Sequence, residues 1–181
     1  MSTRTPGQRA GLTRPAVLDA ARALLARDGL AGLTMRALAE RLGVAPNALY
    51  SHVENKSGLV DDVLDDVLAE VEAPDPEAAD PADGLHALMA STHAVLLAHP
   101  DLVPLYLHRG GANGPNAQRL GEVMLALLAR ADVTGPEGRE ALRVLIVYTI
   151  GFAAFAQPPT EELKANFDAG LRWLLSGIIR S

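Results

Sequence analysis

The sequence of 181 residues contains no cysteine, which excludes disulfide bonds and thiolate metal sites. Aromatic residues make up only 4% of the chain, whereas alanine, leucine and arginine are abundant, a composition that favours helices over strands. The most hydrophobic stretch, 144–156, has only 13 residues, too few to cross a bilayer. The first residues, MSTRTPGQRAG, lack the apolar region of a secretory signal. We therefore expect a soluble, cytoplasmic, all-α protein without a membrane partner.

Charge is distributed unevenly along the chain. Residues 1–57 hold 8 basic and 4 acidic side chains, a net charge of +4, whereas residues 58–181 hold 8 basic and 18 acidic ones, a net charge of −10. A basic part on an acidic body is typical of a protein that meets a polyanion at one end only. Chance clustering of charge is the alternative. We expect a DNA-binding domain over 1–57 and a second domain over 58–181.

Apolar residues recur at helical spacing along most of the chain. An acidic stretch with three prolines, 72–84, reads as a loop. Thr13, Thr34 and Thr160 are candidate helix caps, and Gly29 and Gly43 are candidate helix ends. The pattern predicts about nine helices, near 13–27, 34–42, 45–52, 55–72, 86–100, 102–109, 117–131, 136–156 and 160–178.

Two short helices, 34–42 and 45–52, are predicted to meet at a tight turn at Gly43. Ala39 is small enough to let the two helices approach, and Leu49 packs the second helix onto the first. This is the spacing of a helix-turn-helix motif, whose second helix can enter the DNA major groove, about 12 Å wide. An ordinary corner between two core helices is the alternative. The side chains left facing outward are short or hydrogen-bonding, as a base-reading surface requires: Asn47, Ala48, Ser51 and His52, with Tyr50 at the edge.

Residues 13–60 resemble the DNA-binding head of the tetracycline-repressor (TetR-type) family of bacterial transcriptional regulators. The resemblance lies in AARALLARDGLAGLTMRALAERLGVAPNALYSHVENKSGLVD, with its succession of GLT, LA, LGV, LY, HV and NK. HPDLVPLYL and FDAGLRWLLSGI are similar, more loosely, to the ligand-binding body of that family. Together these stretches imply a three-helix head with a helix-turn-helix motif, followed by a helical body for ligand binding and dimerisation.

The resemblance implies roles for particular residues of the head. Thr34 and Tyr50 would contact backbone phosphates, Lys56 would bind a phosphate at the start of the fourth helix, and Arg36 could reach a guanine edge. The chain departs from the tetracycline repressor itself at Ser51 and around 46–47, so the operator sequence does not transfer. Arg4 and Arg9 could add DNA contacts or belong to a solubilising tail. The candidate DNA-binding residues are Thr34, Arg36, Pro46, Asn47, Ala48, Tyr50, Ser51, His52 and Lys56.

For the body, the resemblance implies a homodimer through the last two helices and a small-molecule cavity between the central ones. For Leu171, Trp173, Leu174 and Ile178 in the last helix, the alternative is a purely intrachain core. The candidate interface residues are Val147, Phe155, Phe167, Leu171, Leu174 and Ile178. The candidate ligand-binding residues are His86, Met89, His93, Leu97, Tyr106, His108, Met124, Tyr148 and Phe152.

Two groups of residues suggest metal ligation only weakly. His86 and His93 share a helix face and could hold a metal, but a hydrogen-bonded or exposed pair is more common. The carboxylates of Asp61, Asp62, Asp65 and Asp66 lack the Glu-x-x-His partner of a di-metal site, so a solvated helix face is expected. We expect no metal and no cofactor.

The sequence therefore favours a dimeric, ligand-responsive DNA-binding regulator, a repressor released from a palindromic double-stranded operator by a small molecule of unknown identity. Bound to DNA, it would lie at the bacterial nucleoid. One alternative is a helical interaction protein with a vestigial DNA-binding head. The other is a helical enzyme, against which stands the lack of a G-x-S-x-G elbow, a glycine-rich phosphate loop and an H-E-x-x-H motif.

Overall fold

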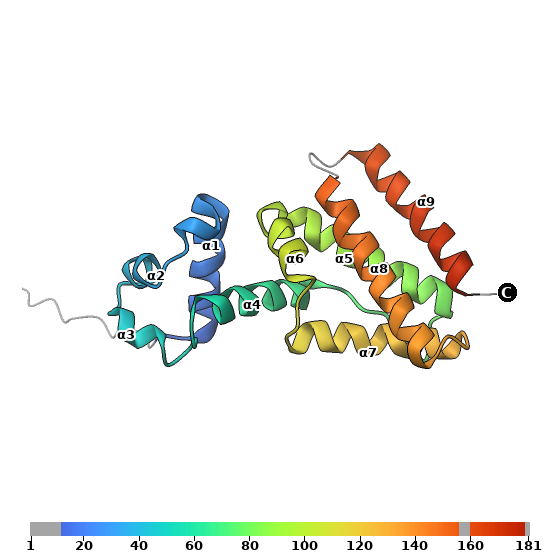
Figure 1. The fold of residues 1–181 in the computed structure, drawn as a ribbon, viewed down its shortest axis with the longest axis horizontal. Helices are drawn as coiled ribbons and strands as arrows, with labels where there is room; N and C mark the ends of the chain where they lie inside the picture. Colours follow the sequence, from blue (N-terminus) through green and yellow to red (C-terminus); the bar gives the residue numbers. More distant parts are fainter. Residues whose placement is uncertain (1–11, 156–159, 180–181) are drawn as a thin grey trace, which may run out of the picture. The chain divides into compact units, whose positions relative to one another are not determined.

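The computed structural model describes residues 12–155 and 160–179, and in these residues it contains nine α-helices, two short 3-10 helices and no strand (Figure 1). The predicted all-α fold is thereby confirmed. The chain forms two compact units, the first ending at Val60 and the second beginning at Asp61. None of the described helices is both long and apolar enough to cross a bilayer. Arg4 and Arg9 lie outside the described residues.

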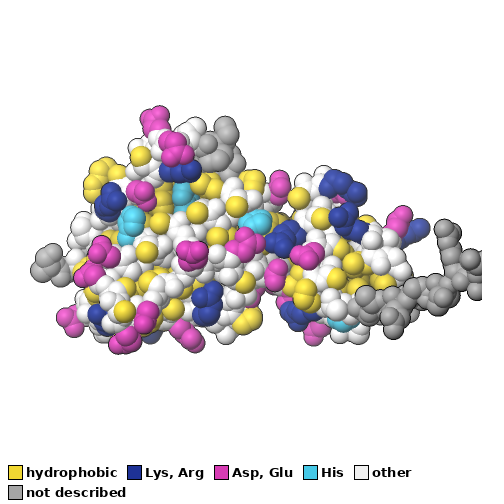
Figure 2. All heavy atoms as spheres, turned by 180° about the vertical axis from the view of Figure 1, so that it is seen from behind, with side chains coloured by type: hydrophobic (Ala, Val, Ile, Leu, Met, Phe, Trp, Pro, Cys, Tyr) yellow, Lys and Arg dark blue, Asp and Glu magenta, His cyan; other side chains and the backbone are white. Residues whose placement is uncertain are grey.

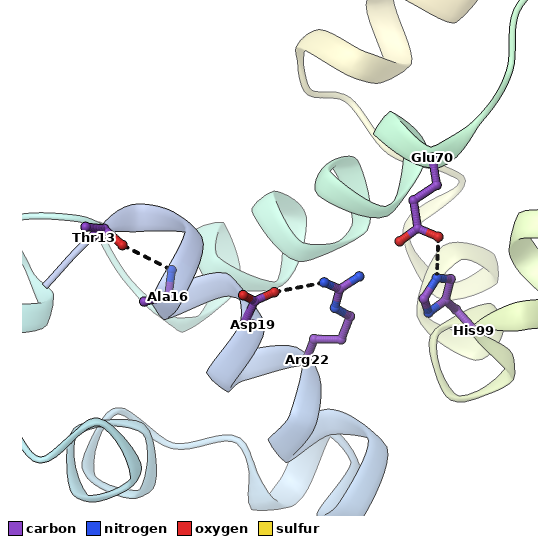
Figure 3. Close-up of polar contacts among 6 residues, drawn as sticks. All are labelled: Thr13, Ala16, Asp19, Arg22, Glu70 and His99. Atoms are coloured by element: carbon purple, nitrogen blue, oxygen red, sulfur yellow. Dashed lines mark hydrogen bonds and ion pairs between the residues drawn. The ribbon is translucent and has the colours of Figure 1, made fainter.

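The first unit is built from three helices, α1 (Arg14–Gly32), α2 (Met35–Leu42) and α3 (Pro46–Leu49). Of these, α1 and α2 begin at the threonine caps Thr13 and Thr34. The Thr13 hydroxyl oxygen accepts a hydrogen bond from the backbone N–H of Ala16 at 3.4 Å, which caps α1 (Figure 3). The helix is interrupted at Gly29, whose φ of 64° is left-handed, so the predicted end becomes a kink with one further turn beyond it.

The second unit is a helical bundle. Its elements are α4 (Lys56–Val67), which begins in the first unit, η1 (Leu68–Glu70), α5 (Pro81–Ala98), η2 (Pro100–Leu102), α6 (Val103–Arg109), α7 (Pro115–Arg130), α8 (Gly135–Phe155) and α9 (Glu161–Ile178). The long helix α5 packs against α7, α8 and α9, and α8 runs antiparallel to α9 (Figure 1). A hydrogen bond at 2.9 Å between Glu70 and His99 ties η1 to the end of α5 (Figure 3).

The acidic loop is shorter than predicted. Helix α5 begins at Pro81, inside the stretch expected to be loop, because Asp80 accepts hydrogen bonds from the backbone N–H groups of Ala82 and Asp83 at 3.0 and 3.2 Å. An aspartate cap followed by proline in the first turn is a strong start signal for a helix. The proline that we interpreted as a loop residue therefore opens the central helix of the second unit.

One carboxylate of the acidic face of α4, Asp65, is buried and not solvated as predicted. Asp65 is only 5% exposed and accepts hydrogen bonds from the backbone N–H groups of Asn116 and Ala117, at 3.1 and 2.9 Å. It thereby caps α7, whose own first residues provide no side-chain cap. Asp61 pairs with Arg109 at the end of α6. The prediction was wrong for Asp65, whose partners lie far away in the sequence, whereas the Asp61 side chain remains 46% exposed.

Candidate functional site

Helices α2 and α3 meet at the predicted turn. Gly43 has φ 66° and ψ 32°, a left-handed conformation that glycine adopts without steric cost. The Val44 N–H donates to the carbonyl of Ala39 at 3.0 Å, and the Ala39 side chain is buried. Leu49 and Val53 are also buried, so one side of the segment after the turn is held in the core. The opposite side is left free for a partner.

The second helix of this motif is shorter than the predicted 45–52. Regular α-helix ends at Leu49, and the chain continues in tight turns in which the His52 N–H donates to the carbonyl of Leu49 at 2.9 Å. The Ser51 hydroxyl donates to the carbonyl of Ala48 at 2.8 Å. This local bond competes with the regular helical pattern, as serine side chains commonly do.

All nine candidate DNA-binding residues are accessible at least in part. Their side chains come from α2, from α3 and the turns after it, and from the start of α4. Tyr50 is 55% exposed, which leaves its ring and hydroxyl accessible to a partner. The exposed candidates are Thr34, Arg36, Pro46, Asn47, Ala48, Tyr50 and Ser51, and the half-buried ones are His52 and Lys56.

Three of the candidates form hydrogen bonds within the chain, and these bonds determine which donors and acceptors remain free for a partner. The Thr34 oxygen accepts from the Ala37 N–H at 3.0 Å, which leaves its hydroxyl hydrogen free to be donated. The Ser51 hydrogen is used within the chain, so its oxygen is left to accept. Lys56 Nζ donates to the carbonyl of Leu30 at 2.6 Å, which positions the ammonium while two of its three hydrogens remain available.

A cavity of about 640 Å³ lies in the second unit, with walls from α5, α6, α7 and α8. This volume suits a small organic ligand. Of the nine predicted ligand-binding residues, Met89, Tyr106 and Met124 line it. The other six do not line it: His86, His93, Leu97, His108, Tyr148 and Phe152. Lining residues that we did not predict include Thr92, Leu96, Gln118, Arg139, Arg143 and Ile146.

Three of the predicted ligand residues, His93, Tyr148 and Phe152, form an aromatic cluster with Phe167 outside the cavity lining. His93 is 4% exposed and stacks on Phe167 with ring centroids 3.8 Å apart, while Phe152 meets it edge-on and Tyr148 packs beside Phe152. Burial lowers the pKa of His93 to about 4, opposed weakly by Asp168. These rings are core residues that hold α5, α8 and α9 together.

His86 lies in a different environment from His93. It lines a separate hollow of about 350 Å³ together with Arg172, and its Nε2 atom is 3.5 Å from a carboxylate oxygen of Asp168. Within the described residues, no group of three or more histidine and acidic side chains is placed to hold a metal ion. His86 and His93 thus lie in different surroundings, one in the second hollow and the other within the aromatic cluster.

The outer face of α8 and α9 exposes large apolar side chains. Phe155 is 90% exposed, Trp173 77% and Val147 62%. Leu174 and Ile178 are half-buried. Phe167 and Leu171 were also expected at the interface, but both are buried in the core of their own chain because they face α5, which leaves them no surface for a partner.

Trp173 lies on the exposed side of α9, opposite the buried stripe of Phe167, Leu171 and Leu175. In the sequence, a large aromatic residue outside the apolar stripe of a helix is a signal for an exposed interaction surface.

Polar contacts connect α4 to the walls of the cavity. The Tyr106 hydroxyl lines the cavity and donates to the carbonyl of Leu64 at 2.5 Å. Burial raises the pKa of Tyr106, with smaller contributions from Asp65 and Glu70, so the phenol remains protonated and keeps this bond. Asp65 holds the start of α7 and Asp61 the end of α6. The cavity helices α6 and α7 are thus bonded to the helix that continues from the first unit.

The sequence matches two known family models. Residues 17–63 match the model described as bacterial regulatory proteins of the tetR family, and residues 73–170 match that of the tetracyclin repressor-like C-terminal domain. A HTH-type transcriptional regulator of Saccharopolyspora erythraea is 38% identical over 140 residues, which is 77% of this chain. The chain spans 59% of the length of that relative.

Solved structures share the fold over almost the whole chain. ActR from Streptomyces coelicolor in complex with (S)-DNPA has a TM-score of 0.79 and 25% identity, covering 94% of this chain and 98% of that one. BioQ with its natural double-stranded DNA operator has a TM-score of 0.76 and 28% identity, covering 94% of this chain and 99% of that one.

Proposed function

Because this chain belongs to the TetR family of bacterial regulatory proteins, whose members are transcriptional regulators and not enzymes, we propose that it is a homodimeric repressor. It binds a palindromic double-stranded operator and leaves it when a small molecule enters the cavity. It acts in the bacterial cytoplasm, at the nucleoid when bound to DNA. The observation that carries the proposal is the exposed polar surface around α3, fixed from behind by a buried leucine and a glycine turn.

DNA contact is assigned to the nine residues around α2, α3 and the start of α4. Arg36 presents a planar guanidinium that can donate two hydrogen bonds to a guanine edge. Thr34 has a free hydroxyl hydrogen and Lys56 has free ammonium hydrogens, both suited to phosphate oxygens. Ser51 offers an oxygen acceptor, which suits the amino group of cytosine or adenine. The BioQ complex with operator DNA supports this assignment.

Dimerisation is assigned to the exposed apolar face of α8 and α9. Val147, Phe155 and Trp173 would be covered by the same face of a second copy, since a two-fold interface uses one surface twice. Leu174 and Ile178 lie at its edge. Gly151 and Gly177 face open space, so a partner helix can approach their backbone closely. Two heads in such a dimer would read two half-sites of a palindrome.

Release by a ligand is assigned to the contacts of the cavity walls with α4. A ligand that binds one arrangement of α6 and α7 better than another shifts the equilibrium between them. Tyr106, Asp65 and Asp61 would transmit that shift to α4. A ligand that prefers the arrangement unfit for DNA lowers the affinity for DNA. By linkage, bound DNA lowers the affinity for that ligand by the same factor. The ligand-bound ActR structure supports a ligand in this type of cavity.

The proposal is tested with the purified full-length protein and the DNA next to its gene. Fluorescence anisotropy at about 150 mM salt, with unrelated DNA as competitor, should reveal one palindromic site bound with a Kd on the order of 10⁻⁸ M or tighter. The bound complex should contain two protein copies. Retardation that depends on salt but not on sequence would contradict the proposal, because phosphate contacts alone produce it.

A further inference from the structure

The inner wall of the cavity is suited to an apolar ligand body. Each of its three hydroxyl groups already donates to a backbone carbonyl: Thr92 to Leu88 at 2.8 Å, Thr149 to Leu145 at 2.8 Å, and Tyr106 to Leu64. The remaining buried lining is mostly hydrocarbon and thioether, from residues such as Met89, Leu96, Leu120 and Met124. A ligand gains little here from polar groups and much from apolar area.

The charged lining of the cavity has one sign only. Arg139 and Arg143 line it, both on α8 and one turn apart, so their side chains share a face of that helix. Residues 58–181 carry 18 acidic side chains, all within the described residues, yet none of them lines the cavity. Several of these side chains are visible on the face shown in Figure 2. In an acidic body, a cavity edged by arginines alone indicates an anionic ligand.

The two arginines are not equivalent. Arg143 donates to Glu140 through Nη2 at 2.5 Å and Nε at 3.1 Å, so part of its charge is compensated. No carboxylate of the described residues pairs with Arg139, which leaves its whole guanidinium for a ligand. The side-chain amides of Asn113 and Gln118 also line the cavity and can donate further hydrogen bonds. A planar guanidinium fork matches the two oxygens of a carboxylate.

We propose that the effector is an organic acid, an apolar body carrying one carboxylate. The carboxylate binds Arg139, with Arg143 beside it, and the apolar body packs on Met89, Leu96 and Met124. This inference rests on the proposed function, in which occupancy of the cavity controls release from DNA, and it names the chemical class that the cavity accepts.

The test compares acids with their neutral amides on the full-length protein without DNA. The probes are 2-naphthoic acid, anthraquinone-2-carboxylic acid and the two primary carboxamides, titrated by calorimetry at pH 7.5. Each acid should bind about tenfold more tightly than its amide, the size expected for a charge-assisted pair at a partly exposed arginine. The preference should shrink at high salt, because exposed charges are screened.

Two variants locate the binding. Arg139→Gln should reduce the preference for acid over amide to about twofold or less, whereas Arg119→Gln, the same change on an exposed arginine of α7 outside the cavity lining, should leave it intact. Gly121→Leu should abolish binding of acid and amide alike. Gly121 lines the cavity, and a Cβ atom there has its nearest neighbour, Leu142 Cδ1, at 3.9 Å, so the new side chain fills the cavity without a clash at its base.

The inference is overturned if the amides bind as tightly as the acids, if none of the ring acids binds, or if Arg139→Gln and Arg119→Gln behave alike. Operator binding, measured separately, distinguishes this failure from failure of the proposed function. A protein that binds its operator but ignores the acids loses only the inference. A protein that binds the acids but no specific DNA loses the repressor assignment, while the ligand class stands.

Discussion

At the scale of single residues, Arg36 and Lys56 carry similar charge but should contribute differently to DNA binding. Arg36→Ala should weaken operator binding by about 1–3 kcal/mol and relax the preference at one base pair, because a guanine edge distinguishes bases. Lys56→Ala should weaken all DNA sequences alike and reduce the salt slope by about 1, because phosphates carry no sequence information. Anisotropy with a set of single-base operator variants measures both effects.

Arg41→Ala is the matched control for these two variants. Arg41 is an exposed arginine of the same helix as Arg36, and it is outside the assigned DNA surface. Since Lys56 also bonds the carbonyl of Leu30, thermal unfolding of Lys56→Ala must be compared with the parent protein. Equal base discrimination in Arg36→Ala and the parent would remove Arg36 from the base-reading surface.

The buried His93 should make the stability of the fold depend on pH. Its pKa is about 4 in the folded protein against 6.5 for a free histidine, so the unfolded chain binds an extra proton between these values. Stability from the neutral, buried ring is therefore complete above pH 6.5 and is lost as the pH falls toward 4. Between pH 7 and pH 5 the loss should be about 2 kcal/mol.

His93→Phe tests this prediction, since phenylalanine preserves the stacking on Phe167 and does not titrate. Urea unfolding at pH 7, 6 and 5 should show a shallower decline for the variant than for the parent. Asp168 and Lys164 act on the same ring, so Asp168→Asn serves as a second comparison. Identical declines in the parent and in His93→Phe would mean that the buried imidazole is not the group that titrates.

At the scale of elements, the start of α7 depends on a residue of α4. Asp65→Ala should cost about 1–3 kcal/mol of unfolding free energy, because the N–H groups of Asn116 and Ala117 lose their acceptor at a helix N-terminus. Asp66→Ala, at the half-buried neighbouring aspartate, should cost much less. Urea denaturation at pH 7 measures both values. Equal losses would show that the cap contributes nothing of its own.

Elements with local signals could be predicted from the sequence, and those with distant partners could not. The caps Thr13, Thr34 and Thr160 bond to N–H groups three residues onward, so a short window contains both partners. Asp65 caps a helix whose first bonded residue lies 51 positions away, which no periodicity reveals. The sequence pattern therefore indicated a solvated carboxylate where the fold has a buried cap.

The face of α5 that lines the cavity could not be predicted from the sequence either. This helix is apolar on several sides because it packs against three other helices, so periodicity could not decide which side faces the cavity. Of the four residues predicted on this helix, His86, Met89, His93 and Leu97, only Met89 lines the cavity. Thr92 and Leu96, which were not predicted, line it as well. In the first unit the helices are amphipathic with one clear apolar side, and the outward residues around α3 followed from the pattern.

At the scale of the whole molecule, the proposed dimer depends on exposed aromatic side chains. Trp173→Glu should shift the protein from dimer to monomer, because it places two charges in an interface that buries apolar side chains. Operator affinity should fall by about 10²-fold or more as the second head is lost. Leu107→Glu, at an exposed leucine of α6, is the matched control. Sedimentation as a dimer in Trp173→Glu would contradict the assigned face.

Val147 belongs to two surfaces at once: it lines the cavity and it stands on the exposed face assigned to the dimer. In the proposed dimer, ligand entry and subunit association are then linked equilibria, and each changes the constant of the other. The dose at which the regulator responds to its effector would therefore depend on how many copies the cell makes. A strain that overproduces the protein should show a shifted threshold as well as stronger repression, and Val147 is the position at which a substitution would tune that threshold.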